Sequence, residues 1–125
     1  MKYIIDSSAW IEYLSGSKAG EEVNKLLKKE EIYVISIIIS EVVSYVKRNG
    51  GNSEIAYESV IKNAKIMEIT PRIAKEAGLL HSTMREKGSN FPLAAALILC
   101  SAKENQAKII TTDNHFKPFK EAILI

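Results

Sequence analysis

Three acidic residues stand where a carboxylate could do chemistry: Asp6, Glu41 and Asp113. Asp6 directly follows the apolar run YII, and Asp113 directly follows KIITT. Glu41 lies three residues after Ile38 and four before Tyr45, which places it on or beside the apolar stripe of a helix. A carboxylate there is partly buried, and burying an unpaired charge is costly unless a cation, hydrogen bonds or a raised pKa compensates.

Each of these acids also has an ordinary structural interpretation. An Asp at a strand-to-helix junction is a common helix N-cap, which would account for Asp6 and equally for Asp113. A lysine or arginine partner would account for the third acid. Two acids at the ends of parallel strands would face the same crevice, however. The more specific hypothesis is that all three acids bind one metal ion.

The ligand types available indicate which metal such a site would take. Carboxylate oxygens favour a hard cation such as Mg²⁺ or Mn²⁺, which usually keeps several waters. Zinc is disfavoured because His81 and His115 are isolated in the sequence. The only cysteine, Cys100, lies in the apolar run ALILCSA and is expected to be a buried core residue.

The elements that must position the acids alternate between strands and helices. Strands are expected over residues 2–6, 32–36, 65–69, 107–113 and 121–125. Helices are expected over residues 7–14, 18–30, 37–51, 53–64, 71–86 and 92–105. Ser36 is expected to cap the third helix, and Thr70 the fifth, with Pro71 in its first position. Apolar strands alternating with helices predict an α/β fold with a mainly parallel sheet, whose active site lies at the carboxyl ends of the strands.

The composition is that of an ordinary globular protein. The 125 residues are 46% hydrophobic and 26% charged, which predicts a single domain over residues 1–125 with its own core. No apolar run approaches the ~18 residues of a membrane span, and Met1-Lys2 leads straight into a strand, so we expect no membrane segment and a cytoplasmic location.

The net charge of +2 excludes the broad basic surface of a histone, so any contact with nucleic acid must be local. The candidate basic clusters are Lys25, Lys28 and Lys29; Lys47 and Arg48; and Lys117 and Lys120. Cations at the last turn of a helix are favoured by the helix dipole in any case.

Three segments together carry a family resemblance. The opening IIDSSAWIEYL resembles the start of PIN-domain proteins, in particular the VapC-type toxins of toxin–antitoxin pairs. SEVVSYV is similar to their second motif, a glutamate in the helix after strand two. ALILCSAKENQAKIITTDNHF is similar to their closing motif, which ends in Thr-x-Asp-x-x-Phe, here Thr111, Asp113 and Phe116. The resemblance covers nearly the whole chain in order and spacing.

This resemblance implies a three-layer α/β/α PIN-like fold with a mainly parallel sheet of about five strands, and metal-dependent hydrolysis of RNA phosphodiesters. It implies that Asp6, Glu41 and Asp113 hold Mg²⁺ or Mn²⁺, with Thr111 as a further catalytic group and Ser7 as a supporting one. A carboxylate-bound Mg²⁺ can deliver a hydroxide-like water to phosphorus. A homodimer and a small antitoxin partner, whose C-terminal segment blocks the site, are also implied.

One position departs from the family pattern. PIN domains usually have another Asp near the start of the last long helix, 18 residues before the strand-end acid, and that position is Ala95 here. Three explanations are open: a natural variant with weakened or lost cleavage, a deliberate inactivating change, or an enzyme that works with three acids. Alanine is the best helix former, so such a change would leave the fold intact.

Two other functional classes remain as alternatives. A catalytically inactive PIN-like binding module is favoured by Ala95. A phosphoacceptor receiver domain has a similar length and a similar late Lys-Pro pair, here Lys117-Pro118, but it needs adjacent acids after its first strand, where this chain has serines. The aromatic residues Trp10 and Tyr13 are expected to lie in the core or in a dimer contact rather than to stack on RNA.

Overall fold

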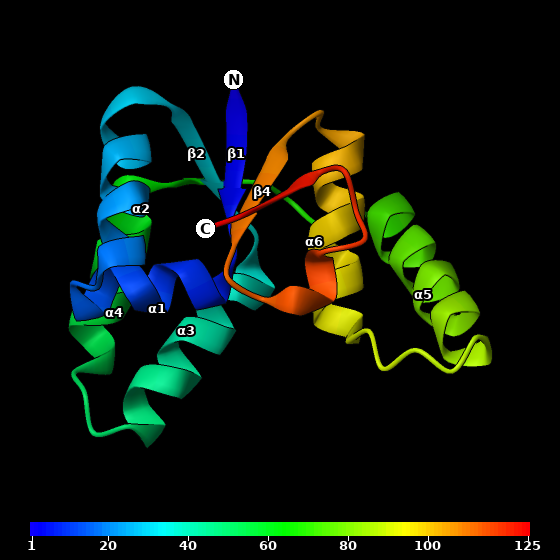
Figure 1. Ribbon diagram of the computed structural model, residues 1–125, viewed down its shortest axis with the longest axis horizontal. Helices are drawn as coiled ribbons and strands as arrows, with labels where there is room; N and C mark the ends of the chain where they lie inside the picture. The colour runs from blue at the N-terminus through cyan, green and yellow to red at the C-terminus, as the bar shows by residue number, and fades with distance from the viewer.

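A five-stranded parallel sheet runs through the centre of the computed structural model, which describes all residues 1–125 (Figure 1). Its strands are β1 (Lys2–Ile5), β2 (Glu31–Val34), β3 (Lys65–Ile66), β4 (Lys108–Thr111) and β5 (Ala122–Leu124). Their order in the sheet is β3-β2-β1-β4-β5, and every neighbouring pair is parallel. The expected mainly parallel sheet is therefore confirmed. Because β1 and β4 are parallel neighbours, the residues that follow them, including Asp6 and Asp113, lie near each other at the carboxyl ends of the strands.

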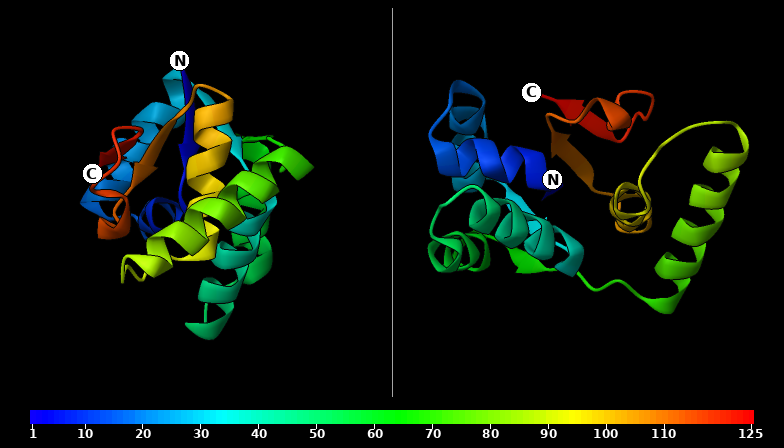
Figure 2. Two further views of the ribbon diagram at one scale, coloured as in Figure 1. Left: turned by 90° about the vertical axis from the view of Figure 1, so that its right-hand side faces the viewer. Right: turned by 90° about the horizontal axis from the view of Figure 1, so that it is seen from below.

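Helices cover both faces of this sheet. They are α1 (Ser7–Ser15), α2 (Lys18–Lys29), α3 (Ser36–Arg48), α4 (Ser53–Asn63), α5 (Pro71–Glu86) and α6 (Leu93–Glu104), with a short 3₁₀ helix η1 (Asn114–Phe116) after β4. Figures 1 and 2 show α1, α2 and α4 on one side of the sheet and α5 and α6 on the other. The α/β/α arrangement implied by the family resemblance is thus present. None of the helices combines the length and apolar character needed to cross a membrane.

The core forms where the apolar strands meet these helices. Ile4 and Ile5 on β1 have no exposed surface, and Ile109 on β4 has none either, because helices pack on both faces of the central strands. Trp10 is also fully buried and makes an edge-to-face contact with Tyr13, with ring centroids 5.9 Å apart. Trp10 is therefore a core residue, as expected.

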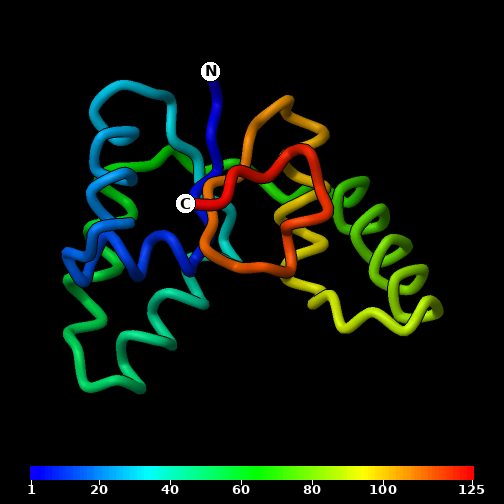
Figure 3. The backbone as a smooth tube through the Cα atoms, in the orientation of Figure 1, coloured from blue at the N-terminus to red at the C-terminus, as the bar shows by residue number.

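Helix α3 extends away from the sheet at the carboxyl ends of the strands, as the trace in Figure 3 shows. It packs against α1 and α4. This places one face of α3 opposite the first turn of α1, where Asp6, Ser7 and Ser8 lie.

Several element boundaries differ from the expected ones. Thr70 caps α5 as predicted, since its Oγ1 accepts a hydrogen bond from the Ile73 amide at 3.2 Å. The prediction for Ser36 was wrong: Ser36 is already helical, and Ile35 takes the capping position without a side-chain bond, because β2 runs almost directly into α3. Cys100 is half-buried rather than fully buried.

The third strand is much shorter than the expected range 65–69. It pairs only with β2, and the amide of Met67 still donates to the Val34 carbonyl at 2.9 Å before the chain leaves the sheet. Residues 68–70 then cross towards α5 on the other side of the sheet. The apolar pattern of KIMEI reflects burial of Met67 and partial burial of Ile69 rather than continued strand pairing.

Candidate active site

Asp6 occupies the junction between β1 and α1. Its amide donates to the Ile110 carbonyl at 2.9 Å, which continues the pairing of β1 with β4 by one residue. Its carboxylate Oδ1 accepts from the Ser7 amide at 2.7 Å and caps α1. The N-cap interpretation is therefore confirmed. The side chain is also almost fully buried, with the residue 3% exposed.

The second oxygen of Asp6 joins a network of hydroxyl groups. Oδ2 accepts from Thr111 Oγ1 at 2.8 Å and from Ser8 Oγ at 2.9 Å. Thr111 Oγ1 in turn accepts from the Asp113 amide at 2.9 Å, and Ser8 Oγ from the Thr112 amide at 3.0 Å. These bonds hold the end of β4 against the first turn of α1. Ser8 was missed in the sequence, although the repeated serine after the acid was a signal for it.

Glu41 projects from α3 towards the same edge. The neighbouring Ile38 and Val42 are fully buried, whereas Glu41 is half-buried. Its Oε1 atom is buried without a hydrogen-bond partner, and no lysine or arginine forms an ion pair with it. The simplest explanation for a buried glutamate, a basic partner, is therefore not found. An unpartnered carboxylate oxygen is costly to bury and is suited to a cation.

Burial and neighbouring negative charges raise the pKa values of Asp6 and Glu41. The pKa of Asp6 is raised by burial, against the lowering effect of its bonds from Thr111, Ser8 and Ser7, and the charge of Asp113 raises it further. The pKa of Glu41 is raised first by burial and then by the negative charges of Asp6 and Asp113, while the Ser7 hydroxyl lowers it. A carboxylate whose pKa is raised by burial and by neighbouring negative charges is stabilised in its charged form by a bound cation.

Asp113 is more exposed than Asp6, with 34% of its side-chain surface accessible. Its Oδ1 accepts from the His115 amide at 2.9 Å and lies 2.8 Å from the His115 Nδ1 atom, so it caps η1. His115 is exposed, as expected of a loop residue, but its ring is held by Asp113. Sequence reasoning thus placed Asp113 at the correct edge of the sheet without anticipating this local pairing.

The donor set fits a hard divalent cation in its chemistry. The donors are carboxylate oxygens, and the buried Oε1 of Glu41 has no other partner. No three His, Cys, Asp or Glu side chains are close enough to ligate one ion together. Since Mg²⁺ usually takes one or two carboxylates and keeps several waters, three carboxylates around a hydrated ion remain compatible with it.

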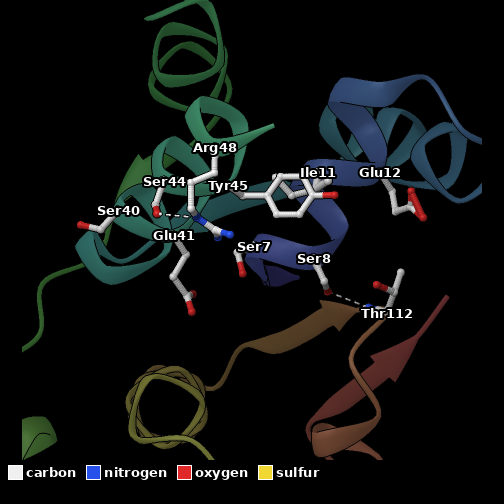
Figure 4. Close-up of a pocket in the computed structure, with 10 residues that line it drawn as sticks. All are labelled: Ser7, Ser8, Ile11, Glu12, Ser40, Glu41, Ser44, Tyr45, Arg48 and Thr112. Atoms are coloured by element: carbon white, nitrogen blue, oxygen red, sulfur yellow. Dashed lines mark hydrogen bonds between the residues drawn. The ribbon is translucent and has the colours of Figure 1, made fainter. Parts of the chain in front are cut away.

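A groove of about 620 Å³ opens beside these acids, between α1 and α3 (Figure 4). Most of the residues that line it are polar or charged; the full set is Ser7, Ser8, Ile11, Glu12, Ser40, Glu41, Ser44, Tyr45, Arg48 and Thr112. Tyr45 is 43% exposed here, so it does not belong to the buried stripe of α3 as the sequence suggested. Tyr45 was not identified from the sequence as a residue that lines this groove. The spacing of Ser44, Tyr45 and Arg48 from Glu41, by three, four and seven residues, was the available signal.

Ala95 lies in the first turn of α6, is 4% exposed and packs in the core. The start of α6 lies beside the segment after β4, because Phe91 packs edge-to-face on Phe116 with centroids 5.9 Å apart and also contacts Phe119. The position of the expected fourth acid, Ala95, therefore lies on α6, whose first turn is close to the segment that contains Asp113.

Solved structures with a similar fold include toxin–antitoxin complexes. VapBC2 from Rickettsia felis, bound to a DNA fragment from its promoter, is 18% identical, with a TM-score of 0.78 over 100% of this chain and 98% of that one. A toxin–antitoxin complex from Klebsiella pneumoniae is 19% identical, with a TM-score of 0.76 over 97% and 95%. The sarcin-ricin loop cleaving toxin VapC20 from Mycobacterium tuberculosis is 12% identical, with a TM-score of 0.73 over 94% and 95%.

The sequence comparison is most informative at the level of the family. No curated protein matches the chain in sequence. The model of the PIN domain family matches residues 3–121, from the first strand to the last loop. The chain therefore belongs to the PIN domain family.

Proposed function

We propose that this protein is a metal-dependent ribonuclease of the VapC toxin class. PIN domains are typically nucleases and usually use Mg²⁺. The observation that carries the proposal is the buried Oε1 of Glu41, which has no hydrogen-bond partner in the protein. It belongs to a carboxylate whose pKa is raised by burial and by the charges of Asp6 and Asp113. Cleavage of the sarcin-ricin loop by a structural neighbour favours RNA as the substrate.

In this proposal Asp6, Glu41 and Asp113 together hold Mg²⁺ or Mn²⁺. One or two of them are direct ligands and the rest act through waters on the ion, because no three such side chains are close enough to ligate one ion directly. The bound ion would supply a hydroxide-like water for attack on phosphorus and would stabilise charge on the leaving oxygen. Thr111 and Ser8 orient the Asp6 carboxylate through the bonds to its Oδ2 atom. This fixes one ligand before the ion binds, so little reorganisation is needed at that position.

A PIN-like module that only binds is the second candidate, and Ala95 is the residue that favours it. Without a fourth carboxylate the site carries less negative charge, which weakens its hold on a divalent cation or misplaces the attacking water. A small antitoxin and a homodimeric state stay predictions for either candidate. The Klebsiella pneumoniae complex makes an antitoxin a reasonable partner to test.

Cleavage of RNA by the purified protein tests the proposal. The protein as written and its Ala95→Asp variant are incubated with RNA in Mg²⁺ or Mn²⁺, each beside a matching form that also carries Asp6→Asn. Metal-dependent cleavage that Asp6→Asn abolishes supports the ribonuclease. If only the Ala95→Asp form cuts, the chain has a nuclease fold that is inactive because the carboxylate expected at position 95 is missing. If neither form cuts any RNA tried, the binding module replaces the enzyme.

A further inference from the structure

The groove beside Glu41 continues along one face of α3. Ser44, Tyr45 and Arg48 follow Glu41 by three, four and seven residues, so all of them lie on the same side of the helix and line the groove (Figure 4). Seven residues of helix rise by about 10.5 Å, so the backbone of Arg48 stands beyond that of Glu41, although its side chain turns back towards Ser44. The face thus adds a polar and aromatic surface to one side of the proposed catalytic centre.

Arg48 provides an unpaired positive charge in this groove. Its Nε atom donates to Ser44 Oγ at 3.3 Å, which turns the side chain back along the helix. Two glutamates, Glu12 and Glu41, line the same groove, yet Arg48 forms an ion pair with neither. Figure 4 shows its guanidinium group directed into the groove. The remaining N–H groups are free to donate to an anion with several oxygens, such as a phosphate.

Tyr45 provides a flat surface next to that charge. Its ring is 43% exposed and lies in the groove near Ile11, with the Arg48 Cζ atom 6.0 Å from its centroid. Exposed aromatic rings beside an arginine are the usual platform on which single-stranded nucleic acids stack their bases. A base in a duplex is stacked on its neighbours and cannot reach such a ring.

We propose that this face of α3 binds the nucleotide next to the scissile phosphate of a single-stranded RNA, with Arg48 on its phosphate and Tyr45 under its base. The inference rests on the proposed ribonuclease function and adds to it the two residues of α3 that would hold the RNA beside the cleavage site. A neighbouring nucleotide is implied because the Tyr45 ring, on which its base would stack, lies about one helical turn beyond Glu41 along α3 and faces Ile11 in the groove. A cation near the acids would also offset their repulsion of the RNA backbone.

RNA binding by the full chain tests this inference without relying on cleavage. A short fluorescently labelled RNA is titrated by anisotropy as a single strand and as a duplex of the same sequence, with Ca²⁺ in place of Mg²⁺ and the RNA checked for integrity afterwards. The variants are Arg48→Ala and Tyr45→Ala. Their matched controls are Arg85→Ala, an exposed arginine in the last turn of α5, and Tyr57→Ala, a 39% exposed tyrosine on α4 outside the groove.

We expect the single strand to bind more tightly than the duplex. Tyr45→Ala should weaken single-strand binding by about 5- to 150-fold, the range for a stacked base. Arg48→Ala should weaken it by at least about fivefold and lower the slope of log affinity against log salt by about 0.7. The two controls should change affinity by less than about twofold.

Three outcomes would overturn the inference. In the first, the groove variants bind RNA no more weakly than their controls. In the second, the duplex binds as well as the single strand. In the third, an acidic peptide, but no RNA, binds and loses affinity in Arg48→Ala, which would assign the groove to a protein partner. Failure of the ribonuclease proposal is separate, because it is seen in the cleavage assay whether or not the single strand binds.

Discussion

Thr111 connects two of the three acids through a single buried atom. Its Oγ1 donates to Asp6 Oδ2 at 2.8 Å and accepts from the Asp113 amide at 2.9 Å. The residue has no exposed surface, so water cannot replace either bond. The position of the Asp6 carboxylate and the backbone direction at Asp113 are therefore fixed together.

Replacing Thr111 with Val should destabilise the protein and reduce any metal-dependent activity. Valine fills a similar volume but leaves the buried Asp6 oxygen with one donor fewer and the Asp113 amide without its acceptor. A hydrogen bond to a charged group contributes about 1.5–3 kcal/mol, and we expect a loss of that size in the free energy of unfolding, measured by urea denaturation. Thr111→Ser should recover most of it, and the exposed control Thr83→Val should change it by less than about 0.5 kcal/mol. Equal stability of Thr111→Val and the unchanged protein would contradict this role.

Helices α1 and α2 approach each other too closely at Gly20 for any side chain. A Cβ atom there would lie 2.2 Å from the Glu12 carbonyl oxygen and 2.8 Å from the Tyr13 Cα atom, both in the backbone of α1. Gly20→Ala should therefore lower the free energy of unfolding by about 1–3 kcal/mol. In the matched variant Gly78→Ala, on α5, the new Cβ meets nothing within 4 Å, so we expect a gain of about 0.5–1 kcal/mol. Thermal or urea denaturation distinguishes them, and a Gly20→Ala protein as stable as Gly78→Ala would show that α1 and α2 do not pack this closely.

Much of the fold and part of the site could be predicted from local sequence patterns. Apolar runs between helices identified the parallel sheet, and polar residues directly after such runs identified Asp6 and Asp113 at its carboxyl edge. Local patterns were less reliable where tertiary contacts decide the outcome. Residues 65–69 carry a strand-like pattern, but the chain must cross to the other side of the sheet and pairs only through Lys65–Ile66.

The groove could not be predicted because it depends on how α3 meets α1. Tyr45 matches the apolar spacing of α3, yet it is exposed because it lies in the open groove between α3 and α1. Arg48 was one of several basic candidates at helix ends. Only its lack of an ion pair beside two glutamates distinguishes it from the others, and that requires three-dimensional positions.

Neutralising Glu41 should stabilise the metal-free protein. Its charge is penalised by burial and by Asp6 and Asp113, and its Oε1 has no partner. Glu41→Gln removes that penalty, and we expect the Tm at neutral pH without divalent metal to rise by about 2–4 °C, a small gain because the side chain is only half-buried. Glu58→Gln, an exposed acid on α4, is the control and should leave the Tm nearly unchanged. A lower Tm in Glu41→Gln would mean that the Ser7 hydroxyl stabilises the charged form by more than burial and the two neighbouring acids penalise it.

The raised pKa values of Asp6 and Glu41 also set how Mg²⁺ stabilisation depends on pH. For an acid whose pKa is higher in the folded state than in the unfolded state, the folded state binds more protons between the two values, so stability falls as pH rises through that window. The window opens near pH 4, the ordinary range of these side chains, and extends up to the raised values. Above it both acids are charged, and a bound cation relieves the penalty.

We therefore expect Mg²⁺ to raise the Tm at neutral pH and to have little effect near pH 4, where protonated carboxylates compete with the metal. NaCl at the same ionic strength controls for screening. Glu41→Gln should reduce the Mg²⁺-induced shift at neutral pH, whereas Glu58→Gln should keep it. If Mg²⁺ shifts the Tm equally at both pH values, or equally in both variants, the ion is binding elsewhere, and the assignment of these three acids to the metal is wrong.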